Sequence, residues 1–204
     1  MANKTILIYG DSNVHGEAAF NERRLDEDQR WVNIVAGRLG GGYTIIAEGY
    51  SGRTAGDLKT GAWLAHANGQ AHFTAIYGSH TPIDVVIIAL GTNDCHPEYG
   101  QTAADIVVNL QWYRQQVEEY GQRNANSPVP RVVHITPPAF RPSDDYFAAD
   151  PALQQELYEA LLVQGPDTIT VPAVDLSDDG VHFSPQGHTE MAEAVLNWIE
   201  MEGI

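Results

Sequence analysis

Cysteine is almost absent from this 204-residue chain, which contains only Cys95. A single thiol cannot form a disulfide within the chain, so the fold must rest on its hydrophobic core. Long hydrophobic runs are absent too, since no apolar stretch reaches the roughly 20 residues that a membrane-spanning helix needs. The apolar stretch at positions 5–9 is also too short for the core of a signal peptide. We therefore expect a cytoplasmic protein that does not bind membranes.

Positive charge is scarce as well. The chain has 11 Lys and Arg against 27 Asp and Glu, a formal net charge of -16. Such a surface repels nucleic acid and anionic lipid, and it favours neutral over strongly anionic small molecules. High solubility alone would also explain the excess of acid. The hydrophobic fraction of 43% is that of a globular protein, and the length suits one domain over residues 1–204.

Apolar runs of strand length alternate with longer segments of helical periodicity. Residues 83–90 are rich in β-branched side chains, which is typical of a strand buried on both faces of a parallel sheet. The expected strands are 5–9, 43–47, 83–90, 131–136 and 168–174, and the expected helices are about 29–39, 102–120, 151–163 and 184–201. This alternation predicts an α/β fold, a doubly wound sandwich around a five-stranded parallel sheet with flavodoxin-like strand order.

Polar motifs follow four of these strands. Gly10-Asp11-Ser12-Asn13 comes after the first, Ser51-Gly52-Arg53 after the second and Gly91-Thr92-Asn93-Asp94 after the third, while Asp179-Gly180-Val181-His182 follows the fifth. In open α/β sheets, ligands bind beyond the carboxyl ends of the strands. The four motifs are therefore expected to meet at one edge of the sheet.

Ser12, Asp179 and His182 are the residue types of a serine hydrolase. Serine is a weak nucleophile at neutral pH and needs a contacting base, which in turn needs an orienting acid. An Asp three residues before a His can lie on the same turn and accept from one ring nitrogen, with Gly180 allowing the tight bend. Ser12 should begin the first helix, where free N–H groups favour a developing negative charge. A simple helix-capping role for Ser12 is the alternative.

The four motifs resemble the sequence blocks of the SGNH (GDSL-type) hydrolases, and they occur in order over nearly the whole chain. The segments 48–54 and 83–94 are most similar to the small bacterial arylesterase and acyltransferase branch. The resemblance implies a three-layer α/β/α fold and a metal-free esterase that forms homo-oligomers and acts on short-acyl carboxylic esters. The Val14 at the fifth position of the first motif does not fit the Gly-x-Ser-x-Gly elbow of the α/β-hydrolases.

Roles for individual residues follow from the resemblance. Ser12 would be the nucleophile, His182 the base and Asp179 the orienting acid. The backbone N–H groups of Ser12 and Gly52 and the side-chain amide of Asn93 would form the oxyanion hole. Their chemistry agrees, because acyl transfer needs fixed donors where the tetrahedral oxygen develops, and Gly52 has no Cβ to block its N–H.

The acyl pocket is less sharply indicated. His15 stands where the arylesterase branch tends to carry Trp, although a surface histidine is the alternative. Val181 and Phe140 are candidates for an apolar pocket wall, against the alternative of core packing. Asn13 replaces the Leu of the family's name, a variation expected to have little effect.

Four further residues near these motifs are expected to be structural. Asp11 and Asp94 should accept from backbone N–H groups in tight loops. Arg53 should pair with an acid, with contact to a substrate oxygen as the alternative. Cys95 should be a loop thiol rather than a nucleophile.

No cofactor or metal is indicated. The chain has no His-Glu-x-x-His and no glycine-rich nucleotide motif. The sequence thus predicts a serine esterase for small neutral esters, with acyl transfer to alcohols as a further activity. Deacetylation of a carbohydrate such as acetylxylan is the alternative; the aromatic residues Trp63, Trp112 and Tyr146 are too scattered to decide. A catalytically silent binding module is disfavoured, because every triad and oxyanion position is filled.

Overall fold

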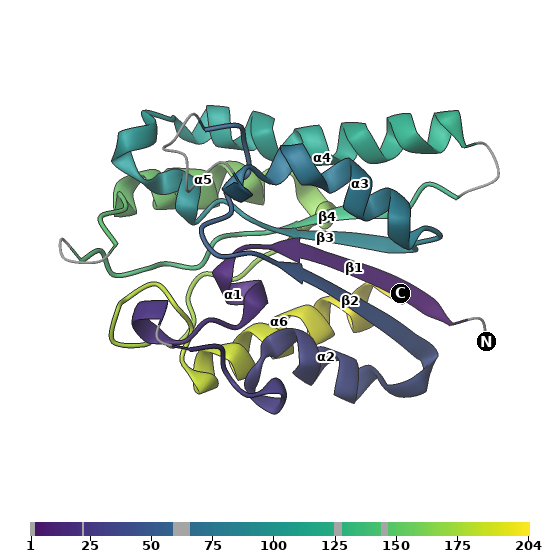
Figure 1. The fold of residues 1–204 in the computed structure, drawn as a ribbon, viewed down its shortest axis with the longest axis horizontal. Helices are drawn as coiled ribbons and strands as arrows, with labels where there is room; N and C mark the ends of the chain where they lie inside the picture. Colours follow the sequence, from purple (N-terminus) through teal and green to yellow (C-terminus); the bar gives the residue numbers. More distant parts are fainter. Residues whose placement is uncertain (1–2, 22, 59–65, 125–127, 144–146) are drawn as a thin grey trace.

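Five parallel strands form one central sheet with helices on both faces (Figure 1). The computed structural model describes residues 3–21, 23–58, 66–124, 128–143 and 147–204. The strands are β1 (Lys4–Gly10), β2 (Tyr43–Gly49), β3 (Val85–Ala89), β4 (Arg131–Ile135) and β5 (Thr168–Ile169). Their order across the sheet is β2-β1-β3-β4-β5, and every neighbouring pair is parallel. This is the predicted flavodoxin-like order, so the predicted fold class is confirmed.

The helices divide into two layers. They are α1 (Ser12–His15), α2 (Trp31–Leu39), α3 (Gly69–His80), α4 (Ala103–Arg123), α5 (Pro151–Leu162) and α6 (Pro185–Glu202). Figure 1 shows α3, α4 and α5 over one face of the sheet and α1, α2 and α6 over the other. The result is a three-layer α/β/α sandwich.

Alternation along the strands explains why both faces are covered. Leu7 and Tyr9 of β1 point into the core under α3, α4 and α5, whereas Ile6 and Ile8 point into the core under α2 and α6. All four side chains are fully buried. Because successive side chains of a strand face opposite sides, an apolar strand such as β1 requires a helical layer on each side.

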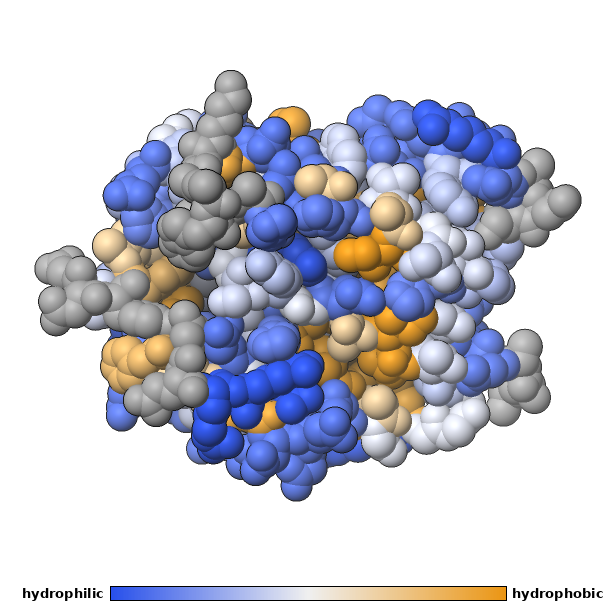
Figure 2. All heavy atoms as spheres, in the orientation of Figure 1, coloured by the Kyte–Doolittle hydropathy of each residue, from blue (hydrophilic) through white to orange (hydrophobic). Residues whose placement is uncertain are grey.

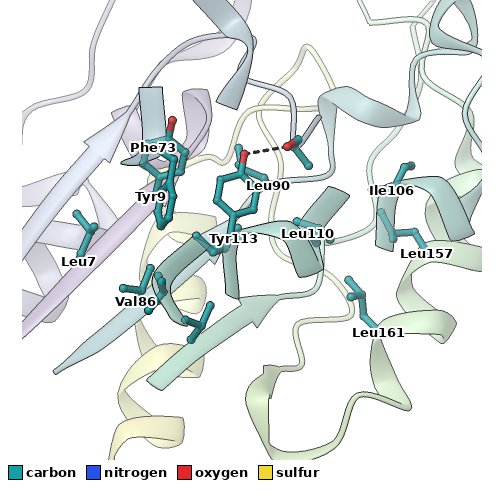
Figure 3. Packing of buried hydrophobic residues seen from close by; sticks show 14 of the residues in the cluster. Leu7, Tyr9, Phe73, Val86, Leu90, Ile106, Leu110, Tyr113, Leu157 and Leu161 are labelled. Carbon is teal, nitrogen blue, oxygen red and sulfur yellow. Dashed lines mark hydrogen bonds between the residues drawn. The ribbon is translucent and has the colours of Figure 1, made fainter. Parts of the chain in front are cut away.

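An aromatic cluster lies in the core between the sheet and helices α3, α4 and α5 (Figure 3). The Phe73 ring packs edge-on against Tyr9 and Tyr113, with ring centroids 5.2 and 4.9 Å apart. Burial raises the pKa of Tyr9 to about 12, and its hydroxyl donates to the Gly69 carbonyl at 2.7 Å. The Tyr113 hydroxyl donates to the Ala55 carbonyl at 2.8 Å. These hydroxyls satisfy their hydrogen-bonding needs inside an apolar layer while they fix the loop after β2.

Two elements differ from the sequence expectation. Helix α3 was not predicted, and β5 ends at Ile169 rather than continuing to position 174. Pro172 lacks an N–H for the ladder, and the Val171 N–H donates to the Thr136 side chain instead, at 2.7 Å. The polypeptide after β5 therefore runs beside β4 without strand pairing.

Within the described residues, no helix is long and apolar enough to cross a membrane.

Candidate active site

The polar motifs meet at the carboxyl edge of the sheet because of strand register. Gly10 of β1 pairs with Gly49 of β2 on one side and with Ala89 of β3 on the other. Ser12, Gly52 and Asn93 each follow this row of paired residues within a few positions. The parallel sheet thus brings the first three motifs together, as the sequence predicts.

Ser12 begins α1 directly after β1. The preceding Asp11 is the N-cap, and its carboxylate accepts from the Asn13 N–H at 3.0 Å. Ser12 is buried, with 6% of its surface exposed. Asp11 thereby takes the capping role that was the alternative for Ser12.

The Asp179–His182 pair lies in the loop that leads to α6. Asp179 Oδ2 is 2.7 Å from His182 Nδ1, and Asp179 Oδ1 accepts from the backbone N–H groups of Val181 and His182 at 3.1 and 3.0 Å. Gly180 makes this turn possible at a φ of 77°. A Cβ there would lie 2.2 Å from the Arg141 carbonyl oxygen, so glycine is required both by conformation and by space.

A second segment fixes the same carboxylate. The Phe20 N–H donates to Asp179 Oδ2 at 2.7 Å, although Phe20 is 159 positions away in the chain. Burial opposes ionisation of Asp179, but hydrogen bonds from His182, Phe20 and Val181 outweigh it and lower its pKa to about 2. Sequence reasoning missed Phe20, because a backbone contact from an irregular loop leaves no residue pattern.

Asn13 connects α1 with the His182 loop. Its side-chain Nδ2 donates to the Val181 carbonyl at 3.2 Å, and its Oδ1 accepts from the Phe183 N–H at 2.9 Å. The two bonds fix Val181 and Phe183, the neighbours of His182, to Asn13, which follows Ser12. Leucine could form neither bond, so the structure gives Asn13 a role that the comparison with the motif did not indicate.

The loops after β2 and β3 supply the other side of the site. The Asn93 side-chain Nδ2 donates to the Arg53 carbonyl at 3.0 Å, which uses one of its two amide hydrogens. Gly52 adopts a φ of 71°, in the left-handed region that favours glycine. The Tyr50 N–H donates to the Gly10 carbonyl at 3.1 Å, which joins the loop after β2 to the end of β1.

Two buried charged side chains support these loops. Asp94 is fully buried and accepts from the Ala55 N–H at 2.8 Å, as expected for a structural acid, and burial raises its pKa to about 6. Arg53 donates to the carbonyls of Gly10 and Glu48, and its guanidinium lies 4.1 Å from the Tyr9 ring centroid. The expected acid partner of Arg53 is wrong: over the described residues it forms no ion pair, and its Nη1 donates to the two strand-end carbonyls while its buried Nε has no hydrogen-bond partner.

The three residues named for the acyl pocket lie in different settings. Val181 and Phe140 are 5% and 8% exposed, and the Phe140 ring packs edge-on against Phe147 at 5.4 Å. His15 ends α1 half-buried, and its carbonyl accepts from Arg24 Nε at 2.7 Å. Their contact with an acyl group stays a prediction.

A cavity of about 20 Å³ lies beneath α1, with room for about one water molecule. Its lining includes Asp11, Asn13 and Val14 but neither Ser12 nor His182, so it is not the substrate site. Cys95 is fully buried in the neighbouring core, and burial raises the pKa of its thiol, as suits an unreactive residue. Over the described ranges, no three His, Cys, Asp or Glu side chains cluster closely enough to hold a metal ion.

A serine at the start of a helix, followed by an asparagine that binds the loop of a buried Asp–His pair at the carboxyl edge of a parallel sheet, defines a serine hydrolase on an α/β fold. Comparison with known proteins agrees. Residues 8–189 match the model of the GDSL-like lipase/acylhydrolase family, and the chain belongs to that family. The chain therefore contains a serine hydrolase domain that acts on carboxylic ester bonds.

Relatives with described activities are of two kinds. An acetylxylan esterase of Xylanibacter ruminicola is 31% identical over 181 residues, which cover 79% of this chain and 36% of the relative. The chain thus spans about a third of the length of that curated relative. A carbohydrate acetylesterase from Sinorhizobium meliloti has 29% identity and a TM-score of 0.86, covering 98% of this chain and 99% of its own. The aryl esterase of M. smegmatis has 26% identity and a TM-score of 0.82, covering 96% and 99%.

Proposed function

We propose that the protein hydrolyses small neutral carboxylic esters with short acyl groups through an acyl-enzyme on Ser12. The observation that carries the proposal is the buried Asp179–His182 pair, with Oδ2 and Nδ1 2.7 Å apart, on a loop that Asn13 ties to the helix of Ser12. The similarity of this protein to esterases along nearly the whole chain supports the same reaction.

The reaction follows from these side chains. Ser12 Oγ attacks the ester carbonyl carbon while His182 takes the hydroxyl proton through Nε2. Asp179 keeps Nδ1 protonated and stabilises the imidazolium that forms. The tetrahedral intermediate collapses when the alcohol leaves with the proton from His182. Water then attacks the acyl-enzyme with the same base, which releases the acid and restores Ser12.

The negative oxygen of each tetrahedral intermediate needs fixed donors. We assign them to the backbone N–H groups of Ser12 and Gly52 and to the Asn93 amide. The Asn93 bond to the Arg53 carbonyl orients the amide before substrate arrives, so little reorganisation accompanies charge development. An alcohol that replaces water in the second half-reaction would give acyl transfer.

The substrate class rests on charge and burial. A net charge of -16 disfavours anionic esters. Val181 and Phe140, the proposed pocket wall, are apolar and buried, which suits an uncharged acyl group. A carbohydrate acetate is the second candidate, favoured by the similarity to an acetylxylan esterase and a carbohydrate acetylesterase.

One experiment tests the nucleophile and the substrate together. A fluorophosphonate probe should label Ser12, and Ser12→Ala should abolish both labelling and the hydrolysis of phenyl acetate and acetylated xylose. The faster of these two substrates distinguishes an aryl esterase from a carbohydrate deacetylase. Labelling at Ser51 or Ser184 would contradict the assignment.

We also propose a homo-oligomer, with no nucleic acid or membrane partner. Strand β2 is an edge of the sheet and its Ile45 and Ile46 are only half-buried. Figure 2 shows hydrophobic atoms at the surface where β2 lies in Figure 1. Multi-angle light scattering of the purified protein would reveal a mass above that of one chain, and a monomer would refute the proposal.

A further inference from the structure

Arg53 is a buried cation at the carboxyl ends of β1 and β2, with only 5% of its surface exposed. Its Nη1 donates to the carbonyls of Gly10 and Glu48, which are the last residue of β1 and the next-to-last of β2. The guanidinium carbon lies 4.1 Å from the Tyr9 ring centroid and 5.7 Å from that of Tyr50. Hydrogen bonds and cation–π contacts together therefore fix the guanidinium in one position.

Burial of this guanidinium opposes stability. Removal from water lowers the pKa of Arg53, although an arginine still carries its charge at neutral pH. Over the described residues the group forms no ion pair, and its buried Nε has no hydrogen-bond partner. Buried charges are normally paired, and apolar side chains of similar volume fill such space at a lower cost in free energy. A cation at this place therefore indicates a use beyond packing.

The backbone of Arg53 is bonded to the two loops that carry proposed oxyanion donors. Its N–H donates to the Tyr50 carbonyl at 3.1 Å and closes the turn in which Gly52 adopts a φ of 71°. Its carbonyl accepts from Asn93 Nδ2 at 3.0 Å. The directions of the Gly52 N–H and of the Asn93 amide thus depend on where the backbone of Arg53 lies.

The guanidinium connects the same backbone to the segment of the proposed nucleophile. The Gly10 carbonyl, two residues before Ser12, accepts from Arg53 Nη1 at 2.8 Å and from the Tyr50 N–H at 3.1 Å. The charge of Arg53 also interacts with the carboxylate of Asp11, which directly precedes Ser12. One side chain therefore joins the end of β1 to the loop after β2.

We infer that Arg53 is a positioning residue that fixes the three proposed oxyanion donors relative to one another. Its guanidinium holds the segment of Ser12 to the loop after β2, and its backbone holds Gly52 and Asn93. This inference rests on the proposed esterase function. Donors that are fixed before the reaction stabilise a developing negative charge without reorganisation, so the effect belongs to the transition state rather than to substrate binding.

The oxyanion forms whether the ester is an aryl or a sugar acetate, so the role of Arg53 does not depend on the substrate class. Of the aromatic residues considered for sugar stacking, Trp112 packs half-buried against Phe73, and Trp63 and Tyr146 lie outside the described residues. Phenyl acetate is therefore a sufficient substrate for a test.

Arg53→Met removes both guanidinium bonds and keeps an unbranched side chain. On phenyl acetate, kcat should fall roughly 10- to 100-fold, because misplaced donors lose much of their effect, while KM should change less than about threefold. Trifluoroacetophenone is the second probe, since attack of Ser12 Oγ on its carbonyl carbon gives a tetrahedral oxyanion. Its inhibition constant should rise by about the factor by which kcat falls. Arg53→Lys keeps a cationic donor on a shorter side chain, and both quantities should lie between those of Arg53→Met and the wild type.

Arg114→Met is the matched control. Arg114 also donates to a strand carbonyl, that of Val132 at 2.9 Å, but Val132 lies near the beginning of β4, at the amino end of the sheet. This variant should lower the melting temperature and leave kcat and the ketone inhibition constant within about twofold of the wild type. A folded Arg53→Met protein with near-wild-type kcat, or a fall in kcat without weaker ketone inhibition, would overturn the inference.

Arg53→Lys decides if Arg53→Met does not fold. Its losses in kcat and in ketone inhibition must then be proportional, and an unchanged kcat refutes the positioning role. A wild-type protein that hydrolyses no ester refutes the proposed function and the inference with it. An active wild type whose folded Arg53 variants behave like Arg114→Met refutes the positioning role alone.

Discussion

Asn13 and Phe183 are 170 positions apart in the chain, and the Asn13 side-chain oxygen accepts a 2.9 Å hydrogen bond from the Phe183 N–H. The amide nitrogen of the same side chain donates to the Val181 carbonyl. Asn13 thus spans His182, the residue between these two backbone groups. Because Asn13 follows Ser12 in α1, one buried amide sets the position of the proposed nucleophile relative to the proposed base.

Replacing Asn13 by alanine should impair both stability and activity. Two buried backbone groups would lose their partners, at a cost of about 2 to 4 kcal/mol in the free energy of unfolding. We expect kcat to fall at least about tenfold, because small displacements of reacting groups are costly. Urea denaturation and kinetics on phenyl acetate measure the two effects. Asn33→Ala, at an exposed position of α2, should change neither appreciably; equal behaviour of both variants would contradict the role of Asn13.

Asn93→Ala tests the oxyanion hole. Loss of one such donor should lower kcat by roughly two to three orders of magnitude, which corresponds to about 3 to 4 kcal/mol of transition-state stabilisation. KM should change little, because the contact strengthens as charge develops on the oxygen. Asn93→Asp should be slower still, since a carboxylate repels the oxyanion. Asn124→Ala removes another amide that donates to a backbone carbonyl, at the exposed end of α4, and serves as the control. A folded Asn93→Ala protein with near-wild-type kcat would remove Asn93 from the mechanism.

Gly180→Ala should be strongly destabilising. Its φ of 77° disfavours a side chain, and the new Cβ would lie 2.2 Å from the Arg141 carbonyl oxygen. Together these effects should lower the free energy of unfolding by about 2 to 4 kcal/mol. The matched control is Gly37→Ala in the exposed face of α2, where a Cβ meets nothing within 4 Å. That variant should raise stability by about 0.5 to 1 kcal/mol, because alanine is the better helix former. Thermal denaturation distinguishes them, and similar melting temperatures would be inconsistent with a strained turn at Gly180.

Asp11→Asn should change how stability depends on pH. Burial raises the pKa of Asp11 from its ordinary value of 3.8 to about 6, although a hydrogen bond from Asn13 and the charge of His182 oppose the change. The folded carboxyl therefore binds its proton more tightly than the unfolded one, and its ionisation lowers the free energy of unfolding as pH rises from about 4 to about 6. Asparagine does not ionise and can still accept from the Asn13 N–H.

The variant should therefore gain stability relative to the wild type across this interval, by about 3 kcal/mol at most. Urea denaturation at a series of pH values measures the difference between the two proteins. The charge of Asp94 adds to the raised pKa of Asp11, so the measured difference includes the interaction between these two carboxyls. If the difference in the free energy of unfolding stays constant from pH 4 to pH 7, folding does not raise the pKa of Asp11.

The sheet could be predicted because each strand has a recognisable pattern of neighbouring residues. The run 83–90 is apolar on both faces, and helices 102–120 and 184–201 begin at capping residues, Thr102 and Ser184, which do accept from backbone N–H groups in the structure. Helix α3 escaped prediction because Gly69, Gly78 and β-branched or aromatic residues lower its helix propensity. Packing of Phe73 and Tyr77 into the core stabilises it instead.

The amino-acid sequence by itself determined the strands of the sheet, the turn at Gly180 and the neighbourhood of Asp179 and His182, because each depends on residues close together in the chain. Only the tertiary structure decided that Asn13 fixes the His182 loop, that the Phe20 N–H donates to Asp179, and that Arg53 donates to carbonyls rather than to an acid. The physical reason is that these contacts join loops from separate strands. Each consists of hydrogen bonds to backbone groups, which every residue carries and which no residue pattern can therefore distinguish.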